Sequence, residues 1–124
     1  MKIREEYTCP LEVVHDIIKG KWKPIIIYKL RKKSMSLSEL ESGIKGINQK
    51  MLLEHLKDLQ EFGIISKKTY EGYPLAVAYS LTEDKGLKIL KAIWIMQDIG
   101  IQIMVENGNT TVLDEKGIDY SQYN

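Results

Sequence analysis

The chain has 124 residues, of which 44% are hydrophobic and 28% charged, and its formal net charge is +1. This length and this composition predict one globular domain with a core of its own. The single cysteine excludes an internal disulfide and a cysteine-rich zinc site.

No membrane segment is predicted. Lys88, Lys91 and Asp98 interrupt the apolar-rich stretch 87–105, whereas a membrane helix needs about 20 mostly apolar residues. No apolar run of the kind found in signal peptides follows the charged start of the sequence. We therefore expect a cytoplasmic protein.

Two helices are predicted near the start of the chain. Pro10 suits the first turn of a helix, and the apolar side of this helix continues to about Gly20. A second helix is predicted at 22–30, where Pro24 is tolerated because it falls in the first turn.

The middle of the chain has the pattern of a helix-turn-helix. Residues 38–41 (Ser-Glu-Leu-Glu) match a capping box and predict a short helix that ends near Gly43. After a turn at Gly46, a longer helix is predicted at 48–62, with Asn48 as its N-cap. Its buried stripe consists of Leu52, Leu56 and Leu59. Two helices joined by a short turn with glycine form a helix-turn-helix.

A β-hairpin is predicted next. Residues 64–70 and 76–81 have the composition of strands, and Gly72 and Pro74 lie in the segment that joins them. A helix followed by such a hairpin is the plan of a winged helix. The expected fold is therefore mostly α with a small β-hairpin wing, a winged helix-turn-helix of the α+β class.

The predicted last helix, 82–105, has more apolar surface than one packed side requires. The first helix has a similar surplus. A symmetric dimer that buries both is the simplest explanation, and the alternative is that one monomer core absorbs them. The predicted dimer interface consists of Val13, Val14, Ile17, Ile93, Trp94, Met96, Ile99 and Ile103.

The predicted domain organisation has three parts. Residues 1–8 are expected to form a flexible N-terminus, and 9–105 the winged-helix domain with its terminal dimerisation helices. The polar segment 106–124 is expected to be a C-terminal tail with weak structure.

The longer helix of the helix-turn-helix is the predicted DNA-reading element. Its N-cap and its outer face consist of Asn48, Gln49, Lys50, Leu53 and Lys57. Glutamine can pair with adenine, lysine with guanine, and leucine can contact a thymine methyl. For a helix taken alone, a solvated surface would be the alternative.

Further side chains are candidates for phosphate contacts, because they are cationic or carry hydroxyls near helix starts and on the wing. They are Lys21, Lys23, Ser38, Lys67, Lys68 and Tyr73. Lysines on an exposed hairpin also discourage aggregation, which is the alternative role for the wing pair.

Cys9 precedes the first predicted helix directly. A helix N-terminus favours a thiolate and so raises its reactivity, which makes Cys9 a redox-sensing candidate. With no second cysteine, oxidation leads to an intersubunit bond, a mixed disulfide or a sulfenic acid. The alternative is a small capping residue without chemistry.

An enzyme is not expected. The sequence has no HExxH, GxSxG or GxGxxG motif, and its two histidines, His15 and His55, lie far apart. We expect no metal and no cofactor.

Several motifs in one order carry a resemblance to a known family. They are Cys9-Pro10, Gly20-Lys21-Trp22-Lys23, the run from Ile47 to Leu52, and Tyr79-Ser80-Leu81-Thr82 with Gly86. Over residues 8–104, the chain resembles the HxlR family of MarR-like winged-helix regulators of bacteria and archaea.

The resemblance implies a homodimeric, DNA-binding transcriptional regulator whose first and last helices build the dimer. Some members sense oxidants or electrophiles through the cysteine that matches Cys9. The wing departs from the family pattern, because residues 75–78 (Leu-Ala-Val-Ala) lack the arginine that often precedes the tyrosine at 79.

The leading hypothesis is a homodimeric regulator that binds double-stranded DNA at a pseudo-palindromic operator, with an oxidant or a small molecule as effector. The alternative is a winged-helix protein-interaction module that does not bind DNA. The low net charge and the missing wing arginine motivate this alternative.

Overall fold

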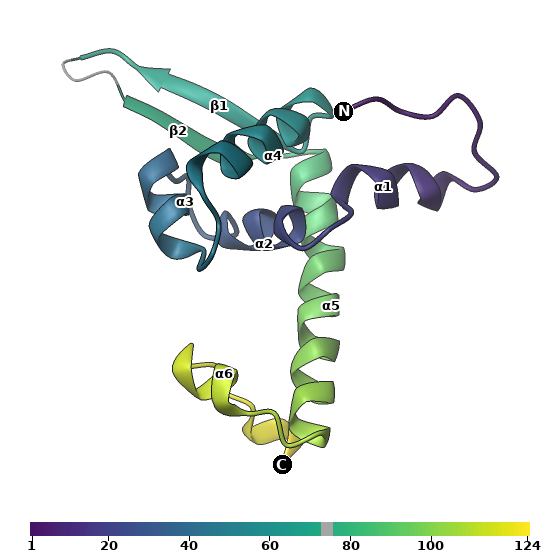
Figure 1. Cartoon of the computed structure of the whole chain (residues 1–124), viewed down its shortest axis with the longest axis vertical. Coiled ribbons are helices and arrows are strands. Elements are labelled where there is room, and N and C mark those ends of the chain that lie inside the picture. The colour runs from purple at the N-terminus through teal and green to yellow at the C-terminus, as the bar shows by residue number, and fades with distance from the viewer. Residues whose placement is uncertain (73–75) are drawn as a thin grey trace. The chain divides into compact units, whose positions relative to one another are not determined.

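A computed structural model describes residues 1–72 and 76–124 of the chain (Figure 1). They form two compact units, 1–90 and 91–124. In chain order the elements are α1 (Pro10–Ile18), α2 (Trp22–Lys29), α3 (Leu37–Gly43), α4 (Gln49–Glu61), β1 (Ile65–Tyr70), β2 (Ala76–Leu81), α5 (Lys85–Glu106), α6 (Thr111–Glu115) and a 3-10 turn (Ser121–Tyr123). The predicted order of four helices, a hairpin and a long helix is confirmed.

The core of the first unit lies where α2, α3 and α4 meet. Leu52, Leu56 and Leu59 follow one side of α4 at intervals of four and three residues, and all three are fully buried. Ile26 and Leu40 face them from α2 and α3 and are also inaccessible to solvent. The leucine stripe predicted from the sequence is therefore the side of α4 that packs on the domain.

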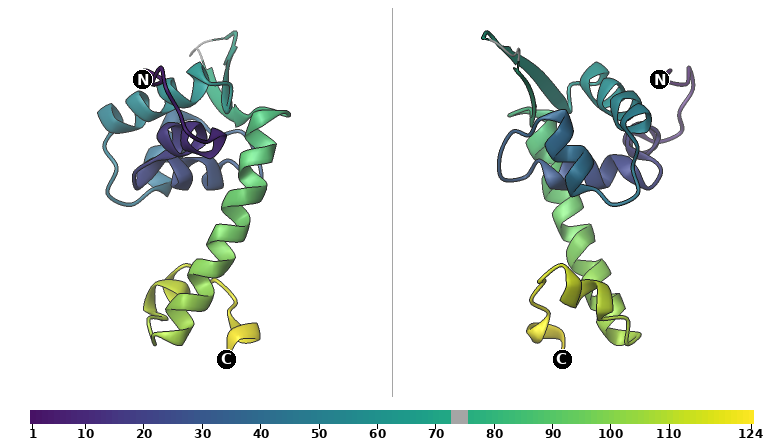
Figure 2. Two further views of the ribbon diagram at one scale, coloured as in Figure 1. Left: turned by 90° about the vertical axis from the view of Figure 1, so that its right-hand side faces the viewer. Right: turned by 60° about the vertical axis from the view of Figure 1, so that its left-hand side comes forward.

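Strands β1 and β2 pair in antiparallel register, with Ile65 opposite Leu81 and Tyr70 opposite Ala76. A further bridge joins Met35 to Tyr79, through backbone bonds of 2.9 and 2.8 Å. The hairpin extends beyond the neighbouring helices in each view (Figure 2). This is the geometry of a wing, and the predicted winged-helix fold is confirmed.

Helix α3 begins two residues earlier than the capping box at 38–41 predicts. The hydroxyl of Ser36 accepts the Glu39 amide at 3.2 Å, and the Glu39 carboxylate accepts the Ser36 amide at 3.1 Å. Bonding to that amide also lowers the pKa of Glu39. The cap is therefore Ser36, and Ser38 lies inside the first turn of the helix.

One hydroxyl joins the end of α4 to the start of α5. Thr82 donates to the Gly63 carbonyl at 2.7 Å and accepts the Gly86 amide at 2.7 Å. A Cβ at Gly86 would lie 2.4 Å from the Ile64 carbonyl oxygen, so only glycine fits there without a shift. Because Thr82 caps α5 in this way, the helix begins at Lys85, three residues after the predicted start.

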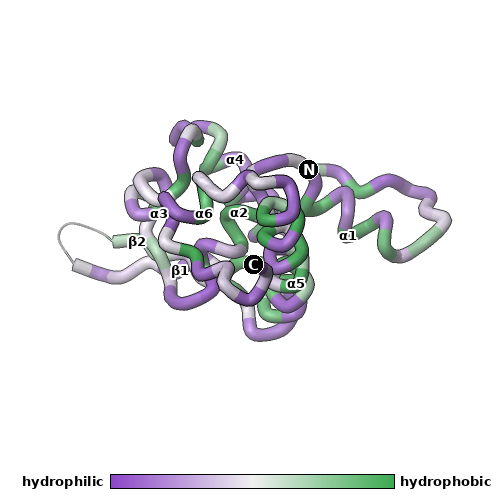
Figure 3. The backbone as a smooth tube through the Cα atoms, turned by 90° about the horizontal axis from the view of Figure 1, so that it is seen from below, coloured by the Kyte–Doolittle hydropathy of each residue, from purple (hydrophilic) through white to green (hydrophobic). Residues whose placement is uncertain are grey.

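Figure 3, which views α5 nearly along its axis, shows hydrophobic positions on this helix. Trp94, Met96, Ile99 and Ile103 of the predicted dimer interface are half-exposed, and Val14 on α1 is also exposed. Ile17 and Ile93 differ from the prediction, because both are already buried within the monomer and belong to its core. None of the helices among the described residues is long and apolar enough to cross a membrane.

The segment 106–124 is more structured than the expected weak tail. It contains α6, whose Leu113 is buried, and a closing 3-10 turn. Tyr120 donates to the Asp114 carboxylate at 2.7 Å, and Tyr123 donates to Asp98 of α5. Each of these bonds raises the pKa of its tyrosine. Burial of one leucine and these bonds supply the order that a polar composition did not predict.

The first eight residues contain no helix or strand, but they contact α1. Arg4 pairs with Asp16 at 2.7 Å, and the Tyr7 hydroxyl donates to the same carboxylate at 3.0 Å. The flexibility expected for residues 1–8 stays a prediction.

Candidate nucleic-acid interface

The outward face of α4 lies away from the leucine stripe. Gln49, Lys50 and Lys57 are exposed there, and Leu53 exposes 42% of its surface although it is apolar. No ion pair holds Lys50 or Lys57 within the part of the chain that the structure describes. The face is thus a set of amide, ammonium and methyl groups that a ligand can reach.

The start of this face is fixed by its cap. The side-chain oxygen of Asn48 accepts the Met51 amide at 2.8 Å, as the sequence predicts for an N-cap. Asn48 is itself exposed. One bond therefore both begins α4 and places its first turn at the surface.

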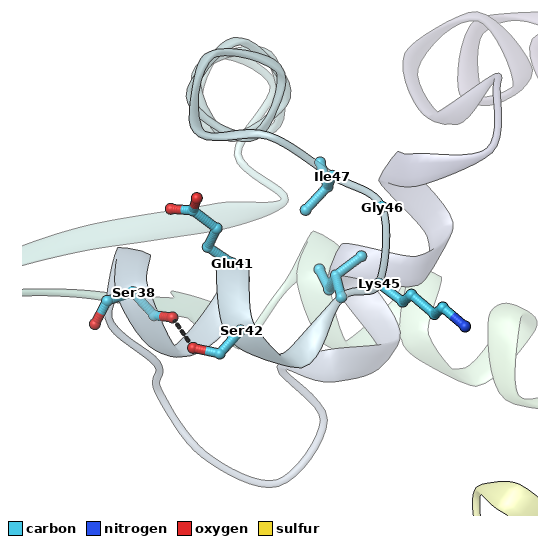
Figure 4. Close-up of a pocket in the computed structure, with 7 residues that line it drawn as sticks. Ser38, Glu41, Ser42, Lys45, Gly46 and Ile47 are labelled. Carbon is cyan, nitrogen blue, oxygen red and sulfur yellow. Dashed lines mark hydrogen bonds between the residues drawn. The ribbon is translucent and has the colours of Figure 1, made fainter.

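An open hollow of about 570 Å³ lies beside the turn of the helix-turn-helix. Figure 4 shows Ser38, Glu41 and Ser42 on α3 at one side and Lys45, Gly46 and Ile47 on the turn at the other. The Ser42 hydroxyl donates to the Ser38 carbonyl at 2.5 Å, which occupies that hydroxyl hydrogen. The Ser38 hydroxyl is exposed within α3 rather than at its cap.

The two lysines before and in α2 have different surroundings. Lys21 is exposed, and its ammonium lies 4.5 Å from the centre of the Trp22 ring. Lys23 is 5% exposed, and its ammonium pairs with Asp58 of α4 at 3.0 Å. The prediction that Lys23 faces a phosphate therefore needs correction, because its charge is turned into the protein and already has a partner.

The wing lysines point to opposite faces of the hairpin, as neighbouring residues of a strand must. Lys67 lies opposite Tyr79, whose burial marks the face that packs on the domain. Lys68 lies on the other face, where its ammonium is 5.1 Å from the centre of the Tyr70 ring. Tyr73, the third wing candidate, lies outside the described residues.

Cys9 lies at the N-cap position of α1, directly before the helix as the sequence predicts, and its side chain is exposed. The Glu12 carboxylate accepts the backbone amides of Thr8 and Cys9 at 2.7 and 3.2 Å, and these bonds lower the pKa of Glu12. The thiol is therefore accessible to solvent at the start of α1.

Comparison with known families decides what this arrangement is. The family of HxlR-like helix-turn-helix proteins matches residues 17–107, which span the helix-turn-helix, the wing and α5. The chain belongs to the HxlR-like family.

Relatives of this HxlR-like chain are described as regulators. The HTH-type transcriptional regulator YkvN of Bacillus subtilis is 39% identical over 79 residues, which are 64% of this chain and 67% of YkvN. The regulatory protein MalR of Fusobacterium mortiferum is 35% identical over 98 residues, 78% of this chain and 92% of MalR. The chain is therefore a transcriptional regulator of the helix-turn-helix type.

Solved structures extend the likeness to the fold. The redox regulator HypR in its reduced form aligns with a TM-score of 0.71 at 31% identity, covering 86% of this chain and 99% of HypR. YkvN, MalR and HypR are all described as regulators.

Two structural features of this HxlR-like chain were missed by sequence reasoning. Ser36 was overlooked because Ser36-Leu37-Ser38-Glu39 and the next Ser-x-x-Glu match overlap. The role of Asp58 as the partner of Lys23 was also missed, although the sequence around Lys23 carries a signal for a buried partner. A lysine at 23 next to Trp22 and before a run of isoleucines is a charge in an apolar segment, and such a charge needs a partner.

Proposed function

We propose that this regulator binds DNA in a sequence-specific manner and acts as a homodimer on a pseudo-palindromic operator. The observation that carries the proposal is the exposed face of α4, the second helix of the helix-turn-helix, directly before a wing, with no ion pair to its lysines among the described residues. An α-helix fits the major groove, and Gln49, Lys50 and Leu53 offer the groups that distinguish base edges there.

The wing supports the affinity of this contact rather than its specificity. Lys68 and Tyr70 lie on the solvent-facing side of the hairpin, so we assign phosphate contact first to Lys68. Lys67 contacts a phosphate only where DNA reaches the edge of the hairpin. Lys21 and Ser38 remain candidates for phosphate contacts from the helix starts.

The dimer is proposed from the half-exposed apolar side chains of α5 together with Val13 and Val14 of α1. Two copies would place their α4 helices in successive major grooves, so the half-sites should lie about 10 bp apart, or a multiple of that distance. An inverted repeat in the operator follows from the twofold symmetry of such a dimer.

Cys9 is the proposed point of redox control. Its thiol is exposed at the cap of α1, and HypR, a structural neighbour, is described as a redox regulator. Because Cys9 is the only cysteine, its oxidation would join two copies or attach a small thiol, and either product changes the dimer near α1.

The test is selection of duplexes from a random pool by the purified, reduced protein. An enriched inverted repeat is expected, and its affinity should fall about a thousandfold between 50 and 200 mM salt if about six phosphates are contacted. Repetition after diamide treatment, with Cys9→Ser as control, tests the thiol. No enrichment at low salt would contradict the proposal and favour a protein-interaction module.

The variant Lys50→Ala isolates the reading face. We expect it to weaken binding to the selected repeat by about 10-fold or more, because a good lysine–guanine contact contributes about 1–3 kcal/mol. Lys116→Ala, which removes an equal exposed charge outside the helix-turn-helix, is the control. Equal affinities of the two variants in a titration would remove Lys50 from the interface.

A further inference from the structure

A buried ion pair joins α2 to α4. The Lys23 ammonium lies 3.0 Å from one carboxylate oxygen of Asp58, and the two side chains are 7% and 23% exposed. The other oxygen of Asp58 accepts the amino group of Met1 at 3.0 Å. Lys23 is the buried charged residue of the described part of the chain, and its ammonium is less exposed than the Met1 amino group that shares Asp58 or the cations of the other ion pairs.

Stability does not account for this pair. Burying two charges removes them from water, and an apolar pair of similar volume is often as stable or more stable. Lys23 also lies in the first turn of α2, where the helix dipole disfavours a cation. These general energetics leave room for a role of the pair in how α2 and α4 are arranged.

The position of Asp58 on α4 suggests that the pair affects the rotation of α4 about its own axis. With 100° per residue, Asp58 lies about 180° around the helix from Gln49 and about 140° from Leu53. Lys50 lies about 80° from Asp58, and the leucine stripe lies on the inner side of the helix, between the directions of Asp58 and Gln49. Leucine side chains can repack after a small rotation of a helix. A hydrogen bond between an ammonium and a carboxylate needs a narrow range of donor–acceptor distances, so it resists such a rotation.

The neighbouring histidine leaves this pair undisturbed. His55 lies one turn before Asp58 on α4, and burial, followed by repulsion from Lys23, lowers its pKa. This shift favours the neutral imidazole, which carries no charge to attract Asp58. On Asp58 itself burial raises the pKa, but the bonds from Lys23 and from the Met1 amino group together outweigh it, so the pKa of Asp58 is lowered.

We infer that Lys23 and Asp58 form a positioning pair that sets the rotation of α4, and thereby the direction in which Gln49, Lys50 and Leu53 face. The inference rests on the proposed function, since it assigns to a buried pair part of the accuracy with which the exposed face meets base edges. Binding to phosphates, which needs charge but little register, does not depend on it.

The test is the double variant Lys23→Met/Asp58→Leu, which replaces the pair by apolar side chains. Lys88→Met/Asp84→Leu, which removes an exposed pair with the same substitutions, is the matched control. The readout is the ratio of affinities for the selected repeat and for a scrambled duplex of equal length. We expect this ratio to fall about tenfold or more in the first variant only, with unchanged affinity for the scrambled duplex and an unchanged or higher Tm.

Two outcomes would overturn the inference. If the double variant folds and keeps its ratio, the pair does not position the reading face. If it does not fold, the pair acts through stability. Asp58→Leu alone should lower Tm strongly, because it leaves the Lys23 ammonium buried without its partner.

A readout without DNA separates this inference from the proposed function. If the wild-type protein prefers no duplex, the proposed function fails, and amide hydrogen exchange then decides the role of the pair. In the double variant, amides of α4 should exchange faster relative to those of α2 and α3. Unchanged relative protection of α4 would contradict a positioning role.

Discussion

At the scale of single residues, the start of α3 depends on which of two serines supplies the cap. Both serines are followed three residues later by a glutamate, so the motif alone does not distinguish them. Packing does, because a helix that begins at Leu37 places Leu40 in the core, where it is fully buried. The capping box was predictable, but its register depends on a tertiary contact.

Two alanine substitutions test this register. Ser36→Ala should lower the free energy of unfolding by about 1 kcal/mol, because it removes the acceptor of the Glu39 amide. Ser38→Ala should change it by no more than about 0.5 kcal/mol, as expected for an exposed site. Urea unfolding of both variants measures the difference, and a larger effect at Ser38 would show that the cap is placed incorrectly.

At the scale of elements, the joint at Thr82 connects the end of α4, the wing and the first turn of α5. Its hydroxyl has a donor and an acceptor role at once, and Gly86 allows the backbone of α5 to approach the Ile64 carbonyl. The order of the elements depends on local patterns and was predictable for this reason. The three-residue delay in the start of α5 depends on contacts between segments distant in sequence, which periodicity does not contain.

Isosteric substitution tests the joint. Thr82→Val keeps the shape of the side chain but leaves the Gly63 carbonyl and the Gly86 amide without this partner. The free energy of unfolding should therefore fall by about 1–3 kcal/mol. Thr82→Ser retains the hydroxyl, so its free energy of unfolding should fall clearly less than that of Thr82→Val. Thermal or urea unfolding compares them, and equal losses would mean that packing of the methyl group, not the hydroxyl, holds the joint.

At the scale of the whole molecule, apolar side chains remain at the surface after the monomer core is complete. Ile99 is 50% exposed, and Met96 and Ile103 on the same helix are similar. The sequence correctly predicted that the last helix has more apolar surface than the monomer core covers. It did not separate Ile17 and Ile93, which are buried in the monomer, from the rest, because apolar character alone does not say which partner covers a side chain.

A charge on this surface should separate the two copies of the proposed dimer. We expect Ile99→Glu to shift the protein from dimer to monomer, because an apolar interface would bury an unpaired carboxylate. Gln102→Glu adds the same charge at an exposed polar position of α5 and should leave the dimer intact. Sedimentation velocity or light scattering at equal concentration gives the result, and a persistent Ile99→Glu dimer would exclude this part of α5 from the interface.

Among the candidate DNA-binding residues, too, some positions were predictable from the helix alone and others depended on contacts distant in sequence. The N-cap and the exposed face of α4 were predictable, since both depend on the helix itself. The fate of Lys23 was not, because it depends on Asp58, a residue 35 positions later in the chain, which the fold brings within 3.0 Å.

The exposed sulfur of Cys9 has one practical consequence. Because the sequence contains no other thiol, a maleimide dye or a nitroxide spin label would attach to the unmodified protein at a single site. In a symmetric dimer the two labels would mark the two starts of α1. With nitroxide labels, pulsed electron paramagnetic resonance would measure the distance between them with and without operator DNA, and no substitution in the chain is needed.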